Sequence, residues 1–270
     1  MEQEMNQIKP RVLVGCPTSA HKEYCLQDYA SALKELSYEN FDILIVDNSE
    51  SDSYSEKIKA LGLPVIKAAY SEHARDRVIA SRNILREKAL DGGYDYLLSL
   101  EQDVIPQPNI IEGLLRHKKK ITTGVVYHLF PQKDTNEWIE KPLLALWSRS
   151  ERGKLAFFSA EQILDLSVIV EVDYCSMGCL LISREVLEKI KFRYEEFPYK
   201  TESPDEVKWD DWCFCEDIQE LGYKIHADLG AKCRHLVIGG YSITLGDTTN
   251  VKVLPKDDTM SISIKDLIKE

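Results

Sequence analysis

The chain has 270 residues and a formal net charge of −11, and 44% of its residues are hydrophobic, a composition typical of a globular protein. The acidic balance argues against binding to a nucleic-acid backbone, because such proteins normally carry a basic stripe. No apolar run approaches the roughly 20 residues that span a bilayer, and residues 1–9 are too polar for a signal peptide. We therefore expect a cytoplasmic protein with no transmembrane segment and no nucleic-acid partner, with peripheral membrane attachment left open.

The seven cysteines are an odd number spread over the chain. This favours reduced thiols in a cytosolic compartment over a disulfide framework. A zinc site is the alternative, but no pair of cysteines has the usual C-x₂-C spacing. Most of them lie in apolar runs, so buried thiols are the better interpretation.

In the first half of the chain, apolar runs that fit strands alternate with runs of helical spacing. We expect strands near residues 11–18, 41–47, 64–67, 94–100 and 122–127, and helices near 20–36, 56–61, 73–90 and 109–119. Ser19 is expected to cap the first helix, and Gly92–Gly93 to close the third. Near-continuous apolar strands fit a sheet that is covered on both faces. The alternation therefore predicts an α/β fold with a wound, mainly parallel sheet.

Beyond residue 128 the pattern is looser. Residues 129–173 mix aromatic and charged side chains, and we interpret them as an excursion that forms part of a substrate wall. We expect a strand at 175–182, a helix at 183–190 capped by Ser183, and a loop at 191–208. A helix opened by Asp210–Asp211 should follow at 210–221, and then two strands at 223–227 and 231–237. The tail after residue 242 shows no clear core face.

The apolar run Leu97–Leu100 leads directly into two carboxylates, Glu101 and Asp103. In a strand this i, i+2 spacing places both side chains on one face. Carboxylates at the end of a buried strand suit Mg²⁺ or Mn²⁺, which prefer oxygen ligands and often take the others from substrate phosphates. The alternative is a strand that simply stops at a polar turn, which Pro106 and Pro108 would also explain.

Other acidic residues fall at the carboxyl end of a predicted strand, as Asp47 does, or at the start of a predicted helix, as Asp210 and Asp211 do. Ligands of open α/β sheets bind in the crevice beyond the carboxyl ends of the strands. Several separate segments therefore direct polar groups toward one place.

The motifs that carry a family resemblance are, in chain order, Val14–Thr18, Val46–Ser49, Ala80–Asn83, Gly92–Tyr94, Glu101–Asp103, Asp210–Asp211, Gly222–Ile225 and His235. In this order they resemble the inverting GT-A glycosyltransferases of family 2, with Glu101–Asp103 in the place of the D-x-D motif. The resemblance implies a GT-A fold, with a mixed, mainly parallel sheet flanked by helices, in a single domain over 1–270. It divides the chain into a nucleotide-binding half (about 10–127), an acceptor-binding half (about 128–240) and a tail (241–270).

The resemblance also implies roles on the donor side. It makes Asp103 and His235 ligands of Mn²⁺, or of Mg²⁺, and imidazole favours manganese. The residues that it assigns to the nucleotide sugar, a UDP- or GDP-sugar, are Pro17, Thr18, Asp47, Arg82, Glu101 and Asp103. For Asp47 an Asx turn with Asn48 and Ser49 is an equal alternative, and Arg77 is interpreted as a solvated helix charge.

On the acceptor side, the resemblance makes Asp211 the general base, which takes the proton of the attacking hydroxyl as the sugar inverts. Simple helix capping is the alternative for Asp210 and Asp211. Asp210, Gly178 and Trp212 are assigned to the acceptor, which would be a saccharide, a lipid-linked intermediate or a small molecule. Two other functions stay open: a nucleotidyltransferase on a similar sheet, and a sugar- or nucleotide-binding module without catalysis.

Overall fold

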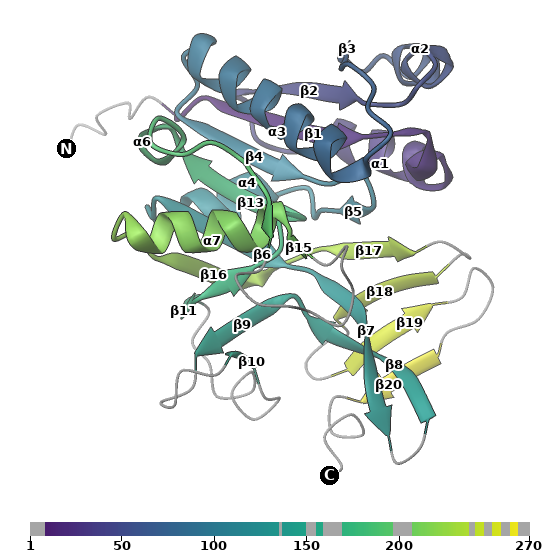
Figure 1. Ribbon diagram of the computed structural model, residues 1–270, viewed down its shortest axis with the longest axis vertical. Coiled ribbons are helices and arrows are strands. Elements are labelled where there is room, and N and C mark those ends of the chain that lie inside the picture. Colours follow the sequence, from purple (N-terminus) through teal and green to yellow (C-terminus); the bar gives the residue numbers. More distant parts are fainter. Residues whose placement is uncertain are drawn as a thin grey trace, which may run out of the picture.

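The computed structural model describes residues 9–134, 137–149, 155–158, 169–196, 207–237, 241–245, 250–254 and 260–263. Its centre is an eight-stranded sheet with the order β11-β16-β6-β13-β4-β1-β2-β3 (Figure 1). In chain order these strands are β1 (Val12–Thr18), β2 (Phe41–Asp47), β3 (Val65–Lys67), β4 (Tyr96–Leu100), β6 (Ile121–Val125), β11 (Ile169–Val172), β13 (Cys179–Ser183) and β16 (Ile225–Lys232).

The direction of the strands makes this a mixed, mainly parallel sheet, as expected from the alternation of strands and helices. β1 pairs in parallel with β2 and β4, β2 with β3, and β16 with β6. β13 runs antiparallel to both β4 and β6, and β11 antiparallel to β16. The carboxyl ends of β1, β2 and β4 therefore meet at one edge, where ligands of such sheets bind.

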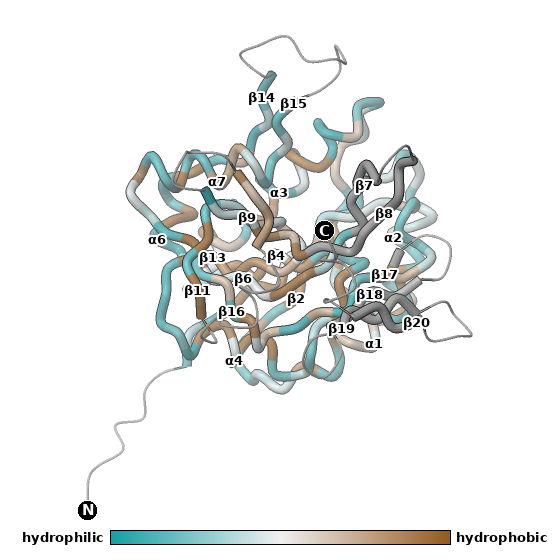
Figure 2. The backbone as a smooth tube through the Cα atoms, turned by 90° about the horizontal axis from the view of Figure 1, so that it is seen from below, coloured by the Kyte–Doolittle hydropathy of each residue, from teal (hydrophilic) through white to brown (hydrophobic). Residues whose placement is uncertain are grey.

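Helices cover both faces of the sheet because successive strand residues point to opposite sides. Leu97 of β4 packs in one hydrophobic cluster, and its neighbour Leu98 in the other. The first cluster includes residues of α3 (Ala74–Asp91), α6 (Arg184–Leu187) and α7 (Asp210–Glu220). The second includes residues of the 3₁₀ helix η1 (Ala20–Cys25), α1 (Leu26–Lys34), α2 (Ser53–Ala60) and α4 (Ile110–Leu115). Figure 2 shows hydrophobic strands at the centre and hydrophilic segments around them.

Smaller sheets adjoin the central one (Figure 1). A five-stranded sheet consists of β5 (Val104–Ile105), β17 (Arg234–Val237), β18 (Tyr241–Leu245), β19 (Asn250–Leu254) and β20 (Met260–Ser263). Three further groups pair among themselves: β7 (Tyr127–Asp134) with β8 (Glu137–Leu144); β9 (Leu146–Arg149) with β10 (Leu155–Phe157) and β12 (Tyr174–Cys175); and β14 (Glu195–Glu196) with β15 (Val207–Lys208). The tail after residue 242 thus contributes strands, which the sequence pattern did not predict.

Several element boundaries differ from the prediction. The hydroxyls of Ser19 and Ser183 make no capping hydrogen bond, although each residue occupies the N-cap position. The predicted helix 109–119 is shorter, because α4 ends at Leu115 and Lys118 adopts a positive φ of 51°. Half of the predicted loop 191–208 lies outside the described residues, and its described ends form β14 and β15.

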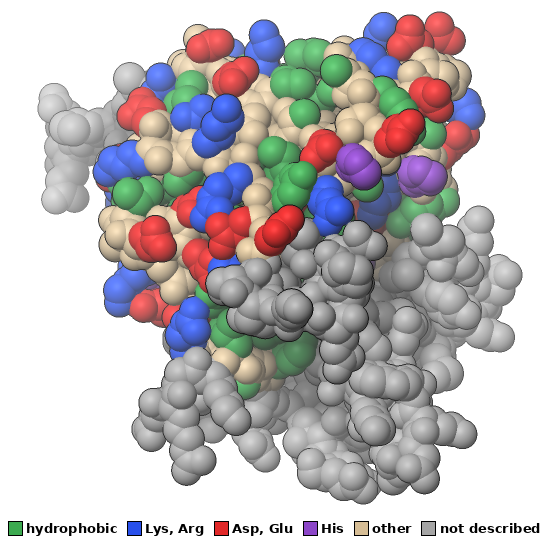
Figure 3. All heavy atoms as spheres, in the orientation of Figure 1, with side chains coloured by type: hydrophobic (Ala, Val, Ile, Leu, Met, Phe, Trp, Pro, Cys, Tyr) green, Lys and Arg blue, Asp and Glu red, His purple; other side chains and the backbone are tan. Residues whose placement is uncertain are grey.

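All seven cysteines are buried free thiols, as the sequence interpretation expected. Within the described ranges, the longest helices lack the length and hydropathy that a bilayer crossing requires. On the face drawn in Figure 3, acidic and basic side chains are interspersed, so the negative net charge does not form a single acidic field there.

Candidate active site

The acidic motif lies immediately after β4. β4 ends at Leu100, and the backbone N–H of Val104 donates to the carbonyl of Glu101 at 2.9 Å, which closes a turn before β5. The argument that places Glu101 and Asp103 on one face of a strand is therefore wrong, since both acids belong to the turn. The turn still sits at the carboxyl end of the central sheet, and the N–H of Glu101 donates to the carbonyl of Gly178 at 3.0 Å.

Strand pairing brings Asp103 and His235 together. β17 pairs antiparallel with β5, with His235 opposite Val104, and the N–H of Leu236 donates to the carbonyl of Asp103 at 2.7 Å. His235 Nε2 consequently lies 3.3 Å from Asp103 Oδ2, and Nδ1 lies 2.7 Å from the carbonyl oxygen of Tyr127. A carbonyl only accepts, so Nδ1 must carry the proton, and Nε2 is the atom aimed at the carboxylate.

This pair fits a cation. Asp103 is 4% exposed, and its Oδ1 is buried and has no hydrogen-bond partner among the described residues. Burial opposes its ionisation, but the hydrogen bond to His235 and the charge of Lys22 outweigh burial and hold the pKa of this carboxyl well below its usual range. With Nδ1 protonated, Nε2 either carries a second proton and donates it to Oδ2, or, in the neutral imidazole, turns its lone pair toward Oδ2, so that a cation could be bound by both atoms. In the part of the chain that the structure describes, no cluster of three or more His, Cys, Asp or Glu side chains forms, so a divalent ion would need waters or substrate oxygens as well.

Gln102, between the two acids, connects three elements and is 1% exposed. Its Oε1 accepts from Thr18 Oγ1 at the end of β1 and from Tyr54 OH of α2, the latter at 2.9 Å. Its Nε2 donates to the carbonyl of Lys22 in η1 at 2.6 Å. The turn that carries Asp103 is thus fixed to β1, to α2 and to the segment between β1 and α1.

Arg82 of α3 links the acidic motif to the start of α7. Its side chain is 5% exposed and forms ion pairs with Glu101, at 2.5 Å, and with Asp210, and it donates to Ser99 Oγ at 3.0 Å. Burial disfavours the charged guanidinium, but the two carboxylates more than compensate and raise the pKa of Arg82. Through this residue the carboxylate of the turn after β4 and that of Asp210 on α7 share one charge network.

Asp211 differs from its neighbour Asp210. It is half-buried, and its Oδ1 accepts from the N–H of Trp212 at 2.7 Å. Burial and the negative charge of Asp210 raise the pKa of Asp211 to about 6. A carboxylate with a raised pKa at the N-terminus of a helix is a suitable proton acceptor near neutral pH.

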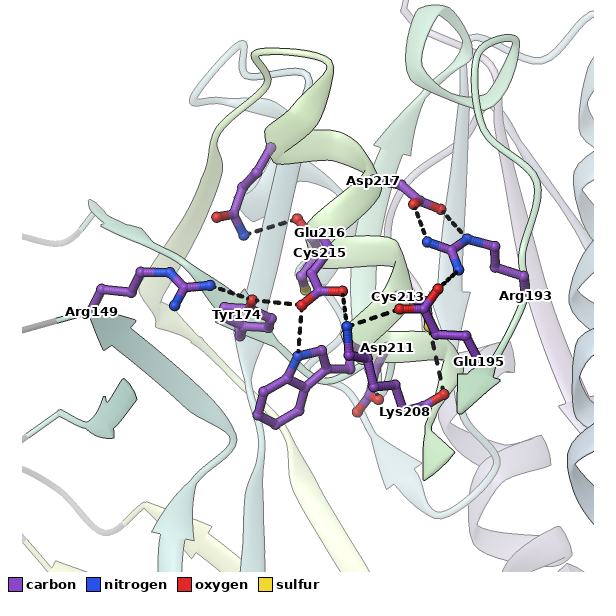
Figure 4. A network of polar contacts seen from close by, with 12 residues as sticks. Arg149, Tyr174, Arg193, Glu195, Lys208, Asp211, Cys213, Cys215, Glu216 and Asp217 are labelled. Atoms are coloured by element: carbon purple, nitrogen blue, oxygen red, sulfur yellow. Dashed lines mark hydrogen bonds and ion pairs between the residues drawn. The ribbon is translucent and has the colours of Figure 1, made fainter. Parts of the chain in front are cut away.

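A network of charged and polar side chains holds α7 in place (Figure 4). Lys208 Nζ lies 2.8 Å from Glu195 Oε1 and 2.9 Å from Glu216 Oε2, which joins β14 and β15 to the helix. Arg193 donates to both carboxylate oxygens of Asp217, from Nη2 at 2.7 Å and from Nε at 3.1 Å. The same helix presents Asp211 at its first turn, so these contacts restrict the position of that carboxylate.

A cavity of about 250 Å³ lies next to the ends of β1 and β2. It is lined by Ser19, Ala20, His21, Asn48, Ser49, Glu50, Ser51, Tyr70 and Arg77. The guanidinium of Arg77 lies 5.1 Å from the centre of the Tyr70 ring, and Tyr70 is 46% exposed. An exposed aromatic ring with polar neighbours at this edge of the sheet can receive a planar ring such as a nucleobase.

The model of the family described as glycosyl transferase family 2 matches residues 20–191, more than half of the chain. The chain belongs to this family. No curated protein is similar enough to match it.

Of three similar solved structures, GalNAc-T7 has a TM-score above 0.5 and supports the fold. GalNAc-T7, crystallised with UDP, GalNAc and Mn²⁺, is similar with a TM-score of 0.56 and 12% identity, over 81% of this chain and 42% of that one. The mannosyltransferase PcManGT from Pyrobaculum calidifontis, in complex with GDP-Man and Mn²⁺, has a TM-score of 0.48 and 13% identity, over 81% of this chain and 55% of that one. A197 from STIV has a TM-score of 0.44 and 16% identity, over 94% of this chain and 93% of that one. The chain thus spans less than two thirds of the first two of these proteins, and it has the GT-A fold.

Asp47 is buried next to the cavity. It is 0% exposed, and its carboxylate accepts from Ser49, Ser55 and Lys67. These contacts fix Ser49 in the cavity wall, and a direct contact of Asp47 with the nucleotide stays a prediction. The Asx-turn alternative agrees with the 2.9 Å bond from the N–H of Ser49.

Thr18 is also buried, and its hydroxyl donates to Gln102, whereas Pro17 is half-buried. Arg77 is half-buried and lines the cavity, a position that its interpretation as a helix charge did not anticipate. Lys22 and Gln102 were missed because their side-chain partners lie 48 to 84 positions away, a separation that no local spacing reveals.

On the acceptor side of this family 2 glycosyltransferase, Trp212 is half-buried and its indole N–H donates to Glu216 Oε1 at 3.3 Å. Its ring lies 4.9 Å from that of Tyr174. Gly178 is bound through its carbonyl to Glu101, and an added Cβ would lie 3.2 Å from the side chain of Val104. Both residues thus adjoin the carboxylate network. Trp209, which precedes Asp210 directly, is 48% exposed and adds an aromatic surface there. In the stretch 129–173, which the sequence analysis interprets as part of a substrate wall, the side chains of residues 129–143 lie outside those that the structure describes.

Proposed function

We propose that this protein transfers a sugar from a UDP- or GDP-sugar to an acceptor hydroxyl, with the help of a divalent cation and with inversion at the anomeric carbon. The observation that carries the proposal is the 3.3 Å approach of His235 Nε2 to Asp103 Oδ2 at the carboxyl end of the sheet. Membership of a glycosyltransferase family and the cavity beside β1 and β2 support the donor class.

Asp103 and His235 would hold the cation, Mn²⁺ in preference to Mg²⁺ because one ligand is an imidazole. When bound, such an ion neutralises the charge that develops on the leaving diphosphate. The structure of GalNAc-T7 contains Mn²⁺ and UDP, which is consistent with this choice. Ser49, Tyr70 and Arg77 would surround the nucleoside, and Glu101, fixed by Arg82, would face the sugar.

Asp211 acts as the general base. The acceptor oxygen attacks the anomeric carbon and forms the new C–O bond, while the bond from that carbon to the diphosphate breaks and the nucleoside diphosphate leaves. The acceptor proton passes to Asp211, whose pKa of about 6 leaves it ionised at neutral pH. Asp210 is neutralised by Arg82 and therefore serves to position the acceptor side of the site, not to take the proton.

The acceptor is a saccharide, free or lipid-linked, or another small molecule. Trp209 supports a saccharide, because exposed aromatic rings stack on sugar faces, and it lies next to the carboxylate pair. The buried free thiols support a reducing, cytoplasmic location.

Thermal unfolding with nucleotides tests the donor assignment. UDP or GDP should raise the melting temperature in the presence of Mn²⁺ and raise it much less without the metal, because the cation links the diphosphate to Asp103. AMP and Mn²⁺ alone serve as controls. If neither UDP nor GDP stabilises the protein under either condition, the proposal is wrong.

A further inference from the structure

The carboxylate of Asp103 already has a cationic partner from this chain. Lys22 Nζ forms an ion pair with Asp103 Oδ2, the same oxygen that faces His235. The side chain of Asp103 is 5% exposed, whereas that of Lys22 is 38% exposed. The lysine therefore reaches from the surface into a buried site, and its head group has access to both.

The backbone of Lys22 is fixed while its side chain is not. The Lys22 carbonyl accepts from Gln102 Nε2 at 2.6 Å and from Cys25 Sγ at 3.1 Å, and its N–H donates to the carbonyl of Ser19 at 2.9 Å. A lysine side chain carries its charge on a flexible four-carbon stem. The ammonium can therefore leave Asp103 without any movement of η1, and it stays within a side-chain length of the acidic motif.

The charges around Asp103 require Lys22 to change its partner when a divalent cation binds. Glu101 and Asp210 share the single positive charge of Arg82, and the carboxylate of Asp103 pairs with a different cation, the ammonium of Lys22. Burial lowers the pKa of Lys22, but the charge and hydrogen bond of Asp103 together with the charge of Glu101 outweigh burial and raise it. A divalent cation that binds Asp103 is repelled by an ammonium a few ångströms away. A nucleoside diphosphate removes this conflict, because its phosphates offer the ammonium another anionic partner.

We propose that Lys22 is a built-in counter-ion that competes with the divalent cation for Asp103 and moves to the diphosphate when the donor binds. The cation and the donor would then bind cooperatively, and the free enzyme would have low affinity for the metal. This inference rests on the proposed function, since it requires a cation and a nucleoside diphosphate at this site.

Binding of Mn²⁺ in the absence of any sugar donor tests it, with the free ion measured by electron paramagnetic resonance. The titrations compare the parent with Lys22→Met, each without nucleotide and with UDP or GDP. Without nucleotide, Lys22→Met should bind Mn²⁺ about tenfold more tightly than the parent, because the competing charge is gone. The gain in Mn²⁺ affinity that the nucleotide gives should be large in the parent and small in the variant.

Two further variants serve as controls. Lys224→Met removes the same charge from an exposed pair with Glu171 and should match the parent. Lys22→Gln is a second neutral variant in case the methionine disturbs folding, and it should behave as Lys22→Met does.

The two ideas fail in different ways. If the parent binds Mn²⁺ in the presence of UDP or GDP, but the neutral variants bind it without nucleotide no more tightly than the parent does, the counter-ion role of Lys22 is wrong and the proposed function stands. If the parent binds no Mn²⁺ with any nucleotide, both are wrong.

Discussion

Asp210 and Asp211 are consecutive residues in the first turn of α7, and Arg82 pairs with Asp210. For Asp211 the structure gives a different contact, the N–H of Trp212 at 2.7 Å. Burial and the negative charge of Asp210 raise the pKa of Asp211. The two adjacent acids thus have different surroundings, and the proposed function gives them different roles, Asp210 in positioning and Asp211 in accepting the proton.

Replacing the carboxylate of Asp211 tests its proposed role as the proton acceptor. Asp211→Asn should reduce kcat by about 10²–10⁴-fold, because an amide cannot take the acceptor proton. The affinity for UDP or GDP with Mn²⁺ should stay close to that of the parent, since Asp211 does not hold the donor. Glu220→Gln, at the exposed end of the same helix, is the matched control and should keep full activity. Equal turnover by Asp211→Asn and the parent would contradict the assignment.

The rate should depend on pH in one direction. Burial and the charge of Asp210 raise the pKa of Asp211 to about 6. Because the base must be ionised, kcat/KM should be low in acid, rise through this pKa and level off above it. A pH–rate profile measures this limb, and it should be absent from the residual activity of Asp211→Asn. A rate that stays constant across this range would exclude Asp211 as the base.

The raised pKa of Asp211 also predicts that the stability of the fold decreases with rising pH, over the range in which the rate increases. A carboxyl whose pKa rises from 3.8 in the unfolded chain to about 6 in the fold stabilises the fold only when protonated. Its contribution is complete below 3.8 and is lost as the pH rises through the folded value. Asp211→Asn should therefore melt at or above the temperature of the parent at about pH 7.5. The difference should shrink in acid. Differential scanning calorimetry at both pH values checks this, and a less stable variant at the higher pH would refute it.

Arg82 should matter for folding as well as for the site. Arg82→Met leaves the buried Asp210 without its cation and Glu101 with one partner fewer. Loss of one member of a buried pair typically costs about 3–5 kcal/mol of unfolding free energy. Urea denaturation measures the loss. Lys120→Met removes an exposed pair with Glu185 and should cost less than about 1 kcal/mol. Similar losses in both variants would show that the buried network contributes no more than a surface pair.

Asp103→Ala should abolish most of the metal-dependent binding of nucleotide. Substitutions of groups that merely support a ligand reduce metal affinity by about 10–100-fold, so loss of the ligand itself should cost about 100-fold or more. Isothermal titration with Mn²⁺ and UDP or GDP measures it. Asp28→Ala, on the exposed face of α1, is the control. Unchanged dependence on Mn²⁺ in Asp103→Ala would show that the metal binds elsewhere.

Much of the fold could be predicted because its signals are local. The helix expected at 73–90 is α3, Ala74–Asp91, since helical spacing and the glycines after it define both of its ends. The helix opened by Asp210 was predicted in the same way. The strands of the tail could not be predicted, because they pair in a small sheet with β5, whose two residues leave hardly any pattern.

The site was predictable only in part. Family resemblance directed attention to Asp103 and His235, which the structure places in contact although 132 positions separate them. Their roles stay predictions. The burial of Asp47 could not be predicted, because its donors come from a turn, from α2 and from β3, and only the packed structure brings them together. The ion pair between Lys22 and Asp103 is likewise visible only in the packed structure.

The place of β13 in the central sheet has a mechanical consequence. This strand bonds to β4 on one side, directly before the acidic turn, and to β6 on the other. Because β13, from the later part of the chain, lies between two strands of the earlier part, the two parts cannot rotate apart as hinged lobes without breaking backbone hydrogen bonds along β13. A widening of the crevice at the end of the sheet would therefore have to come from side chains and loops, not from separation of its strands.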